Sequence, residues 1–498
     1  MRRPAAIPFI VAALLTATPW RAAGQPAAAW ELSLKPIKDA SVFDVGEEPR
    51  VAAVVRNIGS ENPQAVLHFE TTDYDGRVLS AGKAEVSAKA GQQATVLLSL
   101  GDPAKLPHEE YLSVRVVLEA DGKNQAEVRK GFGLLPKRTP EGPPENSPFG
   151  LLAEGSWPLL QRLGARWVRP NWSWAERPMD WARRYGIAYC PLVNEANAFL
   201  RGDLTEAEYA DFVRQSVRRF RHYVRYWQLG NEFDVFHRDG PAAYVEAQRI
   251  GHAAAKAEDP GCIIIGGSIT ELQVRREGWE ESLARGLAQY CDIYDFHFYA
   301  DLKTTQALLD YIHETCRRFG AEKPIWVTET TQVPMFDPDD ENQANYVFKR
   351  YAHLLGNGVS VVFWHALRWP YPYSVDKVQA TALVDYEGFA RPGLFAYAAL
   401  TRELAGARFR RRWPLGEDIY AFEFVRGEQA SLVLWTEAEP KTLTAVLEKP
   451  TRQGDVRVIR PSGQRKRLPA TSQRFSVAAT KAPAIYSFPA PLKSLAPR

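Results

Sequence analysis

The chain has few cysteines and little net charge for its length. Only four cysteines occur in 498 residues, and the formal net charge at pH 7 is +3. So small a charge gives no reason to expect a nucleic-acid partner. The spacing of Cys190, Cys262, Cys291 and Cys316 does not resemble that of metal ligands, and both disulfide pairing and burial as free thiols are open.

Long apolar runs and cofactor motifs are scarce as well. Beyond the N-terminus, no segment approaches the ~20 consecutive apolar residues that a transmembrane helix needs. No group of His, Cys and Asp has the spacing of metal ligands, and no glycine-rich loop suits a phosphate. The sequence therefore implies no cofactor and no metal.

The N-terminus has the pattern of an export signal. Arg2 and Arg3 form a positive start, an apolar stretch runs from Ala5 to Trp20, and small residues follow at 22–24. We expect residues 1–24 to be removed and the mature protein to be periplasmic or extracellular, with no membrane span. An uncleaved anchor is the alternative.

The length of the chain predicts two to four domains. Residues 28–135 read as short strands with turns at Asp75-Gly76 and Asp121-Gly122, which predicts an Ig-like N-terminal β-sandwich. Residues 136–148 contain five prolines and predict a stiff linker. Strands return over 406–492, which predicts a C-terminal β-sandwich.

Between residues 149 and 404, short apolar runs alternate with amphipathic helices. One helix opens with the capping box Thr205 and Glu208. The eight runs begin near residues 149, 165, 187, 224, 263, 293, 324 and 359. Eight such alternations predict a (β/α)8 TIM barrel.

Two glutamates follow apolar runs of this predicted barrel directly. Glu232 ends the fourth run and Glu329 ends the seventh, and catalytic groups of such barrels lie where strands end. Glycoside hydrolysis needs two carboxyl groups, roughly 5–5.5 Å apart for retention or roughly 6.5–9.5 Å apart for inversion. Arg169, after the second run, and Tyr299, after the sixth, are candidates to keep Glu329 ionised.

These motifs resemble the clan A glycoside hydrolases. The matching positions are Asn231-Glu232 on strand four and Glu329 on strand seven, supported by Arg169, by His297 and Tyr299, and by Trp364 on strand eight. The FHFY segment that ends at Tyr299 and the stretch 384–392 are most similar to family 39, which includes β-xylosidases, α-L-iduronidases and bacterial exopolysaccharide hydrolases.

The resemblance implies a retaining glycosidase that works by double displacement on an oligosaccharide or polysaccharide. Glu232 would be the general acid/base and Glu329 the nucleophile. Asn231 would bind the sugar 2-hydroxyl, and Trp364 would form the floor of the subsite for the reacting sugar. Arg169 would support Glu329 from below and Tyr299 would orient it. Many relatives have proline where this chain has Phe233, which leaves the substrate preference open.

Other residues near strand ends are weaker candidates. Asn194 and Glu195 repeat the Asn-Glu pair after strand three, but position favours Glu232 over Glu195 as the acid. For His297, substrate contact and a structural hydrogen bond are equally expected. Glu154 could bind substrate, and Trp172, Trp174 and Trp369 could line sugar subsites or pack loops. Asp234 and His237 are weaker candidates. The arginine run at 408–412 is a less favoured site for an acidic polysaccharide.

Two other functions fit the same residues. The first is a non-catalytic carbohydrate-binding protein on a barrel scaffold, although a pure binder gains little from a pair of carboxyl groups. The second is a transglycosylase that uses the same pair. The sugar, its linkage, internal or terminal cleavage and the oligomeric state are not fixed by the sequence.

Overall fold

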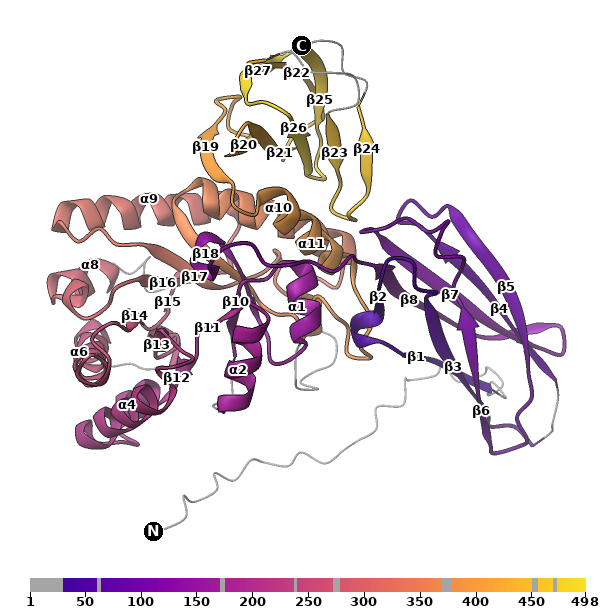
Figure 1. The fold of residues 1–498 in the computed structure, drawn as a ribbon, viewed down its shortest axis with the longest axis horizontal. Coiled ribbons are helices and arrows are strands. Elements are labelled where there is room, and N and C mark those ends of the chain that lie inside the picture. Colours follow the sequence, from indigo (N-terminus) through magenta and orange to yellow (C-terminus); the bar gives the residue numbers. More distant parts are fainter. Residues whose placement is uncertain are drawn as a thin grey trace, which may run out of the picture.

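The computed structural model describes residues 30–60, 64–170, 175–236, 240–271, 278–368, 378–449, 456–468 and 473–498. The expected export signal lies outside the described residues, as do Trp172, Trp174, His237 and Trp369. The chain forms an N-terminal β region, a central α/β region and a C-terminal β region (Figure 1). No helix in the described ranges has the length and apolarity needed to cross a membrane.

The N-terminal β region consists of two sheets that share one apolar core. Their strand orders are β1-β3-β6 and β2-β8-β7-β4-β5. The strands are β1 (Trp30–Pro36), β2 (Val42–Phe43), β3 (Arg50–Asn57), β4 (Ala65–Thr72), β5 (Val78–Val86), β6 (Gln93–Ser99), β7 (Tyr111–Ala120) and β8 (Lys123–Leu134), with the 3-10 helix η1 (Asp39–Ser41). Alternating residues such as Val51, Ala53 and Val55 of β3 are buried, as expected for strands with one face on a core. The turns at Asp75-Gly76 and Asp121-Gly122 join β4 to β5 and β7 to β8.

The central region alternates strands with helices. Its strands are β9 (Phe149–Leu152), β10 (Trp167–Arg169), β11 (Ala188–Tyr189), β12 (Leu192–Val193), β13 (Tyr226–Leu229), β14 (Ile263–Ile265), β15 (Ile269–Thr270), β16 (Tyr294–Phe298), β17 (Ile325–Thr330) and β18 (Val359–Trp364). Its helices are α1 (Trp157–Leu163), α2 (Glu176–Arg184), α3 (Glu195–Leu200), α4 (Glu206–Phe220), α5 (Phe233–Phe236), α6 (Gly240–Glu258), α8 (Gly278–Ala284), α9 (Leu302–Phe319), α10 (Asp340–Gly356) and α11 (Pro392–Leu404). Short 3-10 helices are η2 (Pro144–Asn146), η3 (Leu287–Gln289) and η4 (Val378–Thr381). The expected capping box of Thr205 and Glu208 opens α4.

All strand pairs of the central region are parallel. They form a seven-stranded sheet, β11-β10-β9-β18-β17-β16-β15, and a three-stranded sheet, β12-β13-β14. The last strand, β18, pairs with the first, β9. The two sheets meet where β12 follows β11 after Cys190 and Pro191, and where β15 follows β14 after residues 266–268. A parallel sheet with flanking β regions confirms the mixed α/β class that the sequence predicts.

The strands of this region are apolar because both faces are covered. Every residue of β16 and β17 is buried, whereas the helices that pack around them are apolar on one side only. Arg169, His297 and Glu329 lie near the carboxyl ends of β10, β16 and β17, whereas Asp295 is the second residue of β16. The carboxyl edge of the sheet therefore brings several of the candidate residues together.

The C-terminal β region follows α11. It contains a six-stranded sheet, β19-β20-β21-β26-β23-β24, and a three-stranded sheet, β25-β22-β27. Its strands are β19 (Arg408–Arg412), β20 (Ile419–Arg426), β21 (Gln429–Thr436), β22 (Lys441–Leu447), β23 (Arg457–Ile459), β24 (Arg465–Arg467), β25 (Arg474–Ala479), β26 (Ala484–Phe488) and β27 (Leu492–Pro497). Arg410 and Arg411 of the arginine run both pair with the fully buried Glu423, so these two serve an internal contact.

Contacts between the regions are both apolar and ionic, and Phe422 and Trp435 of the C-terminal β region belong to the same buried apolar cluster as the central region. Arg465 of β24 pairs with Glu109 of the N-terminal region at 2.5 Å, and Lys349 of α10 pairs with Glu437 at 2.9 Å. All four cysteines are free and buried, and burial raises the pKa of each thiol.

Candidate active site

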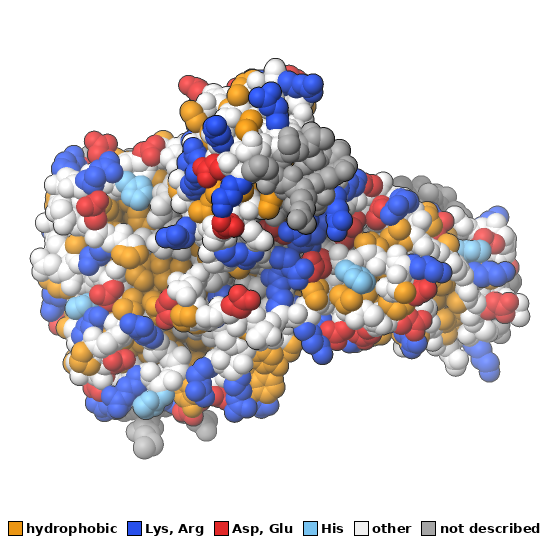
Figure 2. All heavy atoms as spheres, turned by 45° about the horizontal axis from the view of Figure 1, so that its top comes forward, with side chains coloured by type: hydrophobic (Ala, Val, Ile, Leu, Met, Phe, Trp, Pro, Cys, Tyr) orange, Lys and Arg blue, Asp and Glu red, His pale blue; other side chains and the backbone are white. Residues whose placement is uncertain are grey.

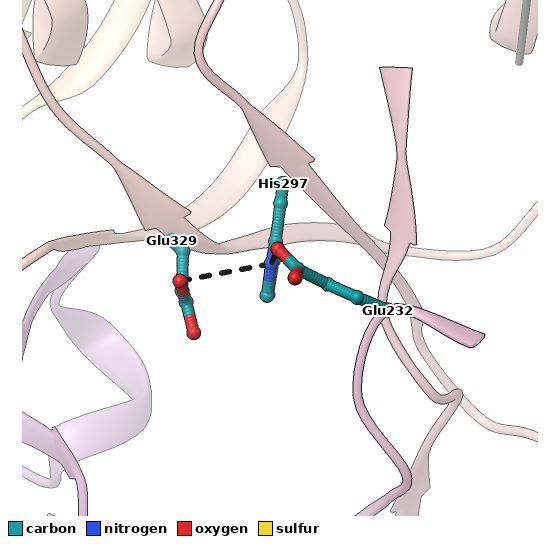
Figure 3. Close-up of side chains that lie close together, drawn as sticks. All are labelled: Glu232, His297 and Glu329. Atoms are coloured by element: carbon teal, nitrogen blue, oxygen red, sulfur yellow. Dashed lines mark hydrogen bonds and ion pairs between the residues drawn. The ribbon is translucent and has the colours of Figure 1, made fainter. Parts of the chain in front are cut away.

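Three strand ends bring Glu232, His297 and Glu329 together. Glu232 follows β13, His297 lies in β16 and Glu329 lies in β17. Figure 3 shows the three side chains converging, with His297 beside both carboxyl groups. One ligand atom from each side chain lies within 4.8 Å of the other two. The two carboxyl groups that the sequence singled out are therefore neighbours in space.

Glu329 accepts hydrogen bonds on both of its carboxylate oxygens. Arg169 of β10 donates from Nη1 to Oε1 at 2.7 Å, and the Tyr299 hydroxyl donates to Oε2 at 2.5 Å. Arg169 itself is fully buried and holds two further acceptors, Gln228 and Asn231. Charge-assisted bonds of this kind stabilise the ionised carboxylate.

The pKa of Glu329 is strongly lowered. Burial alone raises it, but the nearby cationic partners His297 and Arg169 and the hydrogen bond from Tyr299 together outweigh burial. His365, at the end of β18, places Nε2 at 3.9 Å from Glu329 Oε2 and adds to the effect. Glu329 is thus held as an anion.

Glu232 has a different set of contacts. Its Oε1 lies 2.6 Å from Nδ1 of the fully buried His297, and the backbone at Glu232 has φ of 44°. That left-handed conformation is rare for a residue with a side chain and is found mostly where structure or function demands it. Here the conformation follows Gly230 and Asn231, as the chain turns from β13 into α5.

The protons of the His297 ring can be assigned from its neighbours. Thr328 Oγ1 donates to the buried carboxylate of Asp295 at 2.8 Å, so toward His297 it can only accept. His297 Nε2, at 3.0 Å from that oxygen, is therefore the N–H donor. His297 Nδ1 and Glu232 Oε1 are then left to share one proton. The direction of the His297 pKa agrees: burial lowers it, but Glu329 and Glu232 raise it above its ordinary value.

Asp295 is connected by hydrogen bonds to side chains that hold the partners of both glutamates. It is fully buried in β16, and its Oδ2 accepts from Ser268 at 2.6 Å, from Thr328 at 2.8 Å and from Gln228 at 2.9 Å. Gln228 in turn accepts from Arg169. One buried carboxylate therefore supports the Arg169 that binds Glu329 and the Thr328 that binds His297. Burial raises the pKa of Asp295.

The other candidate residues from the sequence have hydrogen-bond partners within the protein. Asn231 exchanges hydrogen bonds with Asn197, backbone N–H to Oδ1 at 2.8 Å and Nδ2 to carbonyl at 2.6 Å, and its side-chain oxygen accepts from Arg169. Trp364 is fully buried and donates from its indole nitrogen to the Thr381 carbonyl at 2.9 Å. The hydrogen bonds of His297 are with Glu232 and Thr328, and its Nδ1 also lies 3.8 Å from Glu329 Oε2. Sugar contacts by these three residues stay predictions.

The rival glutamates have other places in the fold. Asn194 and Glu195 form the start of α3, and burial raises the pKa of Glu195. Glu154 is exposed beyond β9. Neither glutamate belongs to the cluster of Glu232, His297 and Glu329. Trp172 lies outside the described residues, so its predicted sugar contact stays a prediction.

Among the network residues that were not identified from the sequence are Gln228, Thr328, His365 and Asp295. Each lies within three residues of a named candidate, and a polar residue inside an otherwise apolar strand was the available signal. Alternation along the strand could not reveal Gln228, Asp295 and Thr328, because every residue of β13, β16 and β17 is buried.

The cluster also has the atoms that could ligate a cation. Glu232, His297 and Glu329 each offer one ligand atom. However, both oxygens of Glu329 already accept hydrogen bonds, and the Arg169 guanidinium lies 2.7 Å from one of them. A cation there would be repelled by Arg169 and would displace the proton between Glu232 and His297. The geometry favours a pair of carboxyl groups in a hydrogen-bond network.

The fold is similar to the folds of several solved glycoside hydrolases. A family 39 glycoside hydrolase from the gut symbiont Bacteroides cellulosilyticus matches with a TM-score of 0.64 and 16% identity, over 92% of this chain and 99% of that one. The resemblance to family 39 is confirmed at the level of the fold. A GH30 endoxylanase from Clostridium papyrosolvens is also similar, with a TM-score of 0.51 and 11% identity over 69% of this chain and 96% of that one. A glucosidase from Croceicoccus marinus has a TM-score of 0.51 and 12% identity over 70% of this chain and 96% of that one. No protein-family model matches the sequence, and no curated protein does.

Proposed function

We propose that the chain is an exported retaining glycoside hydrolase that acts on an oligosaccharide or polysaccharide, with Glu232 as general acid/base and Glu329 as nucleophile. The observation that carries this proposal is the unequal pair of carboxyl groups. Glu329 accepts two hydrogen bonds and is held ionised, whereas Glu232 shares a proton with His297. A nucleophile and an acid need opposite protonation states at one pH.

We also propose that the parallel strands form a closed (β/α)8 barrel and that the flanking β regions are sandwiches. Support for closure comes from the pairing of β18 with β9 and from β11/β12 and β14/β15, which each link the two sheets in chain order. The carboxyl ends of the strands would then surround one mouth, where the active sites of such barrels lie.

In the first step Glu329 attacks the anomeric carbon of the bound sugar. A bond forms between a Glu329 oxygen and that carbon, and the glycosidic C–O bond breaks. The proton shared by Glu232 and His297 passes through Glu232 to the departing oxygen, which leaves as an alcohol. The product of this step is a glycosyl ester on Glu329.

In the second step water replaces the alcohol. Glu232 takes a proton from the water, the hydroxide oxygen bonds to the anomeric carbon, and the ester bond to Glu329 breaks. Glu329 returns to its anionic state between Arg169 and Tyr299. Two displacements at one carbon leave its configuration unchanged.

The spacing of the two acids supports retention over inversion. Their nearest oxygens lie within 4.8 Å. Inverting enzymes hold the carboxyl groups roughly 6.5–9.5 Å apart to admit a water between them, whereas roughly 5–5.5 Å is usual for retention. The pair also argues against a purely binding protein, since binding alone does not need one proton between Glu232 and His297.

Hydrolysis of a glycoside panel tests the proposal. The panel carries p-nitrophenyl glycosides of both anomers of xylose, glucose and uronic acids, because a xylanase and a glucosidase share the fold. Proton NMR of the first-formed sugar should show the substrate's own anomer. Glu329→Gln should abolish turnover, and the matched control Glu322→Gln, at the other end of β17, should not. Release of the opposite anomer would disprove the double displacement.

A further inference from the structure

A cavity lies away from the two glutamates, where residues 138–147 and the central region meet the C-terminal β region. Its volume is about 550 Å³. The walls come from residues 138–147 before β9, from residues 161–166 between α1 and β10, from the end of α11 and from Arg426 of β20. Strands β9 and β10 begin beside this cavity, and the carboxyl end of β10 carries Arg169 of the active site. The cavity is thus at the opposite end of the strands.

The lining of this cavity is strongly basic. It contains four arginines, Arg138, Arg166, Arg402 and Arg426, and one acidic residue, the exposed Glu141. Figure 2 shows Lys and Arg side chains gathered on the face where the C-terminal β region meets the rest of the molecule. A cavity with this balance of charge has a positive potential that attracts anions.

Three of the four guanidinium groups have no carboxylate partner within the described residues. Arg138 donates to Thr401 Oγ1 at 2.8 Å and to the Ala398 carbonyl at 2.9 Å. Arg166 donates to three backbone carbonyls, and Arg426 to the Ala405 carbonyl. Carbonyl oxygens carry only a partial negative charge, so they do not neutralise the positive charge of these guanidinium groups.

The fourth arginine, Arg402, shares its carboxylate partner with another arginine. Arg402 pairs with Glu109, and Glu109 also pairs with Arg465 at 2.5 Å. Burial, with a smaller contribution from the positive charge of Arg402, lowers the pKa of Arg138 to about 10, although Glu109 and Glu403 act in the opposite direction. Arg166 is buried and Arg138 is partly buried, whereas Arg426 is exposed at the rim. Buried cations without a counter-ion are costly, and an anion in the cavity would offset that cost for Arg138 and Arg166.

We propose that this cavity binds a carboxylate-bearing oligosaccharide, such as a stretch of uronate residues. Its volume lies in the range of small-molecule sites, well above the need of a single inorganic anion. Guanidinium groups pair with carboxylates in a fork geometry, and the exposed side chains of Thr139 and Asn146 in the wall suit sugar hydroxyls. The site would anchor an acidic glycan independently of any hydrolysis at Glu329.

Binding measured without catalysis tests this site. The full chain with Glu329→Gln is titrated calorimetrically with a trimer of galacturonic acid, with neutral galactotriose and with inorganic sulfate. We expect the acidic trimer alone to bind well, and more weakly as salt rises. Arg138→Gln and Arg426→Gln should each weaken it by about tenfold, the effect of one lost charge-assisted hydrogen bond. Arg474→Gln, an exposed arginine of β25 outside the cavity, is the matched control.

Several outcomes would overturn the site. Affinity for the trimer that is unchanged in both variants would place the ligand elsewhere, and a lowered melting temperature with unchanged affinity would mean that the arginines only cap α11. Equal binding of galactotriose would remove the role of charge, and binding of sulfate without the trimer would remove the glycan. If Arg138→Gln does not fold, Arg426→Gln decides alone. None of these outcomes bears on hydrolysis, which the aryl glycoside panel tests separately.

Discussion

Glu232 and Glu329 are the same residue type at equivalent places, each at the carboxyl end of a parallel strand, yet they are held differently. Glu329 is fixed from two sides by Arg169 and Tyr299 and lies close to His297 and His365. Glu232 stands on a left-handed turn with one described side-chain partner, His297. The first environment stabilises a negative charge, and the second places a carboxyl oxygen 2.6 Å from a histidine nitrogen.

This difference shows that position alone does not assign chemical roles. The assignment comes from what each carboxyl group accepts or shares. If the proposed roles are right, small changes around each glutamate should have unlike effects. The following experiments test that contrast, starting with the largest expected effect.

Removal of Glu329 should have the largest consequence. Glu329→Ala is expected to lower kcat/KM on the order of 10⁴- to 10⁶-fold, because no covalent intermediate can form. Added azide should occupy the vacated space and attack from the same side, which yields a glycosyl azide of inverted configuration. Product NMR reads this directly. An azide product of retained configuration would assign Glu329 a different role.

The loss of activity on removal of Glu232 should depend on the leaving group of the substrate. Glu232→Ala is expected to slow hydrolysis of unactivated glycosides about 10²- to 10⁴-fold, the usual contribution of general acid catalysis. Dinitrophenyl glycosides, which depart without a proton, should lose far less in their first step. Azide should now intercept the glycosyl ester on Glu329 and give a product of retained configuration. Equal losses for both classes of substrate would exclude the acid role.

Loss of one donor to Glu329 should have an intermediate effect. Tyr299→Phe removes a hydrogen bond to the ionised carboxylate, so we expect kcat/KM to fall about 10- to 100-fold, the effect of losing one charged hydrogen bond. That hydrogen bond lowers the pKa of Glu329. Its removal should raise this pKa and move the acidic limb of the kcat/KM profile to higher pH. An unmoved acidic limb would contradict the positioning of Glu329 by Tyr299.

The proximity of Glu232 and Glu329 was predictable from the sequence because it follows a general rule of parallel sheets. Apolar runs mark the strands, and Glu232 and Glu329 are the acids that directly follow the fourth and seventh runs. The alternation of strands and helices also gave the α/β class. Local patterns such as the Thr205 capping box were readable because their partners are close in sequence.

The supporting network was not predictable in the same way. Asp295, Gln228 and Thr328 lie on three different strands, and their mutual contacts depend on the register of those strands. A register shift occurs between Phe296 and His297, so counting along the strand does not give the pairing. The cavity at the other end of the strands was likewise hidden, because it joins the linker, α11 and β20 only after folding.

The smallest expected effect concerns the proton between Glu232 and His297. Thr328→Val removes the oxygen that accepts from His297 Nε2, whereas Thr328→Ser keeps it. Without that acceptor the imidazolium is less stable, so the pKa of His297 should fall and the shared proton should be lost at lower pH. We expect the alkaline limb of kcat/KM to move to lower pH in the Val variant alone, with a loss of about three- to tenfold at the optimum. The acidic limb, which depends on Glu329, should stay in place in both variants. Movement of both limbs together would mean that Thr328 acts on the whole site, and that the two carboxyl groups are not controlled separately.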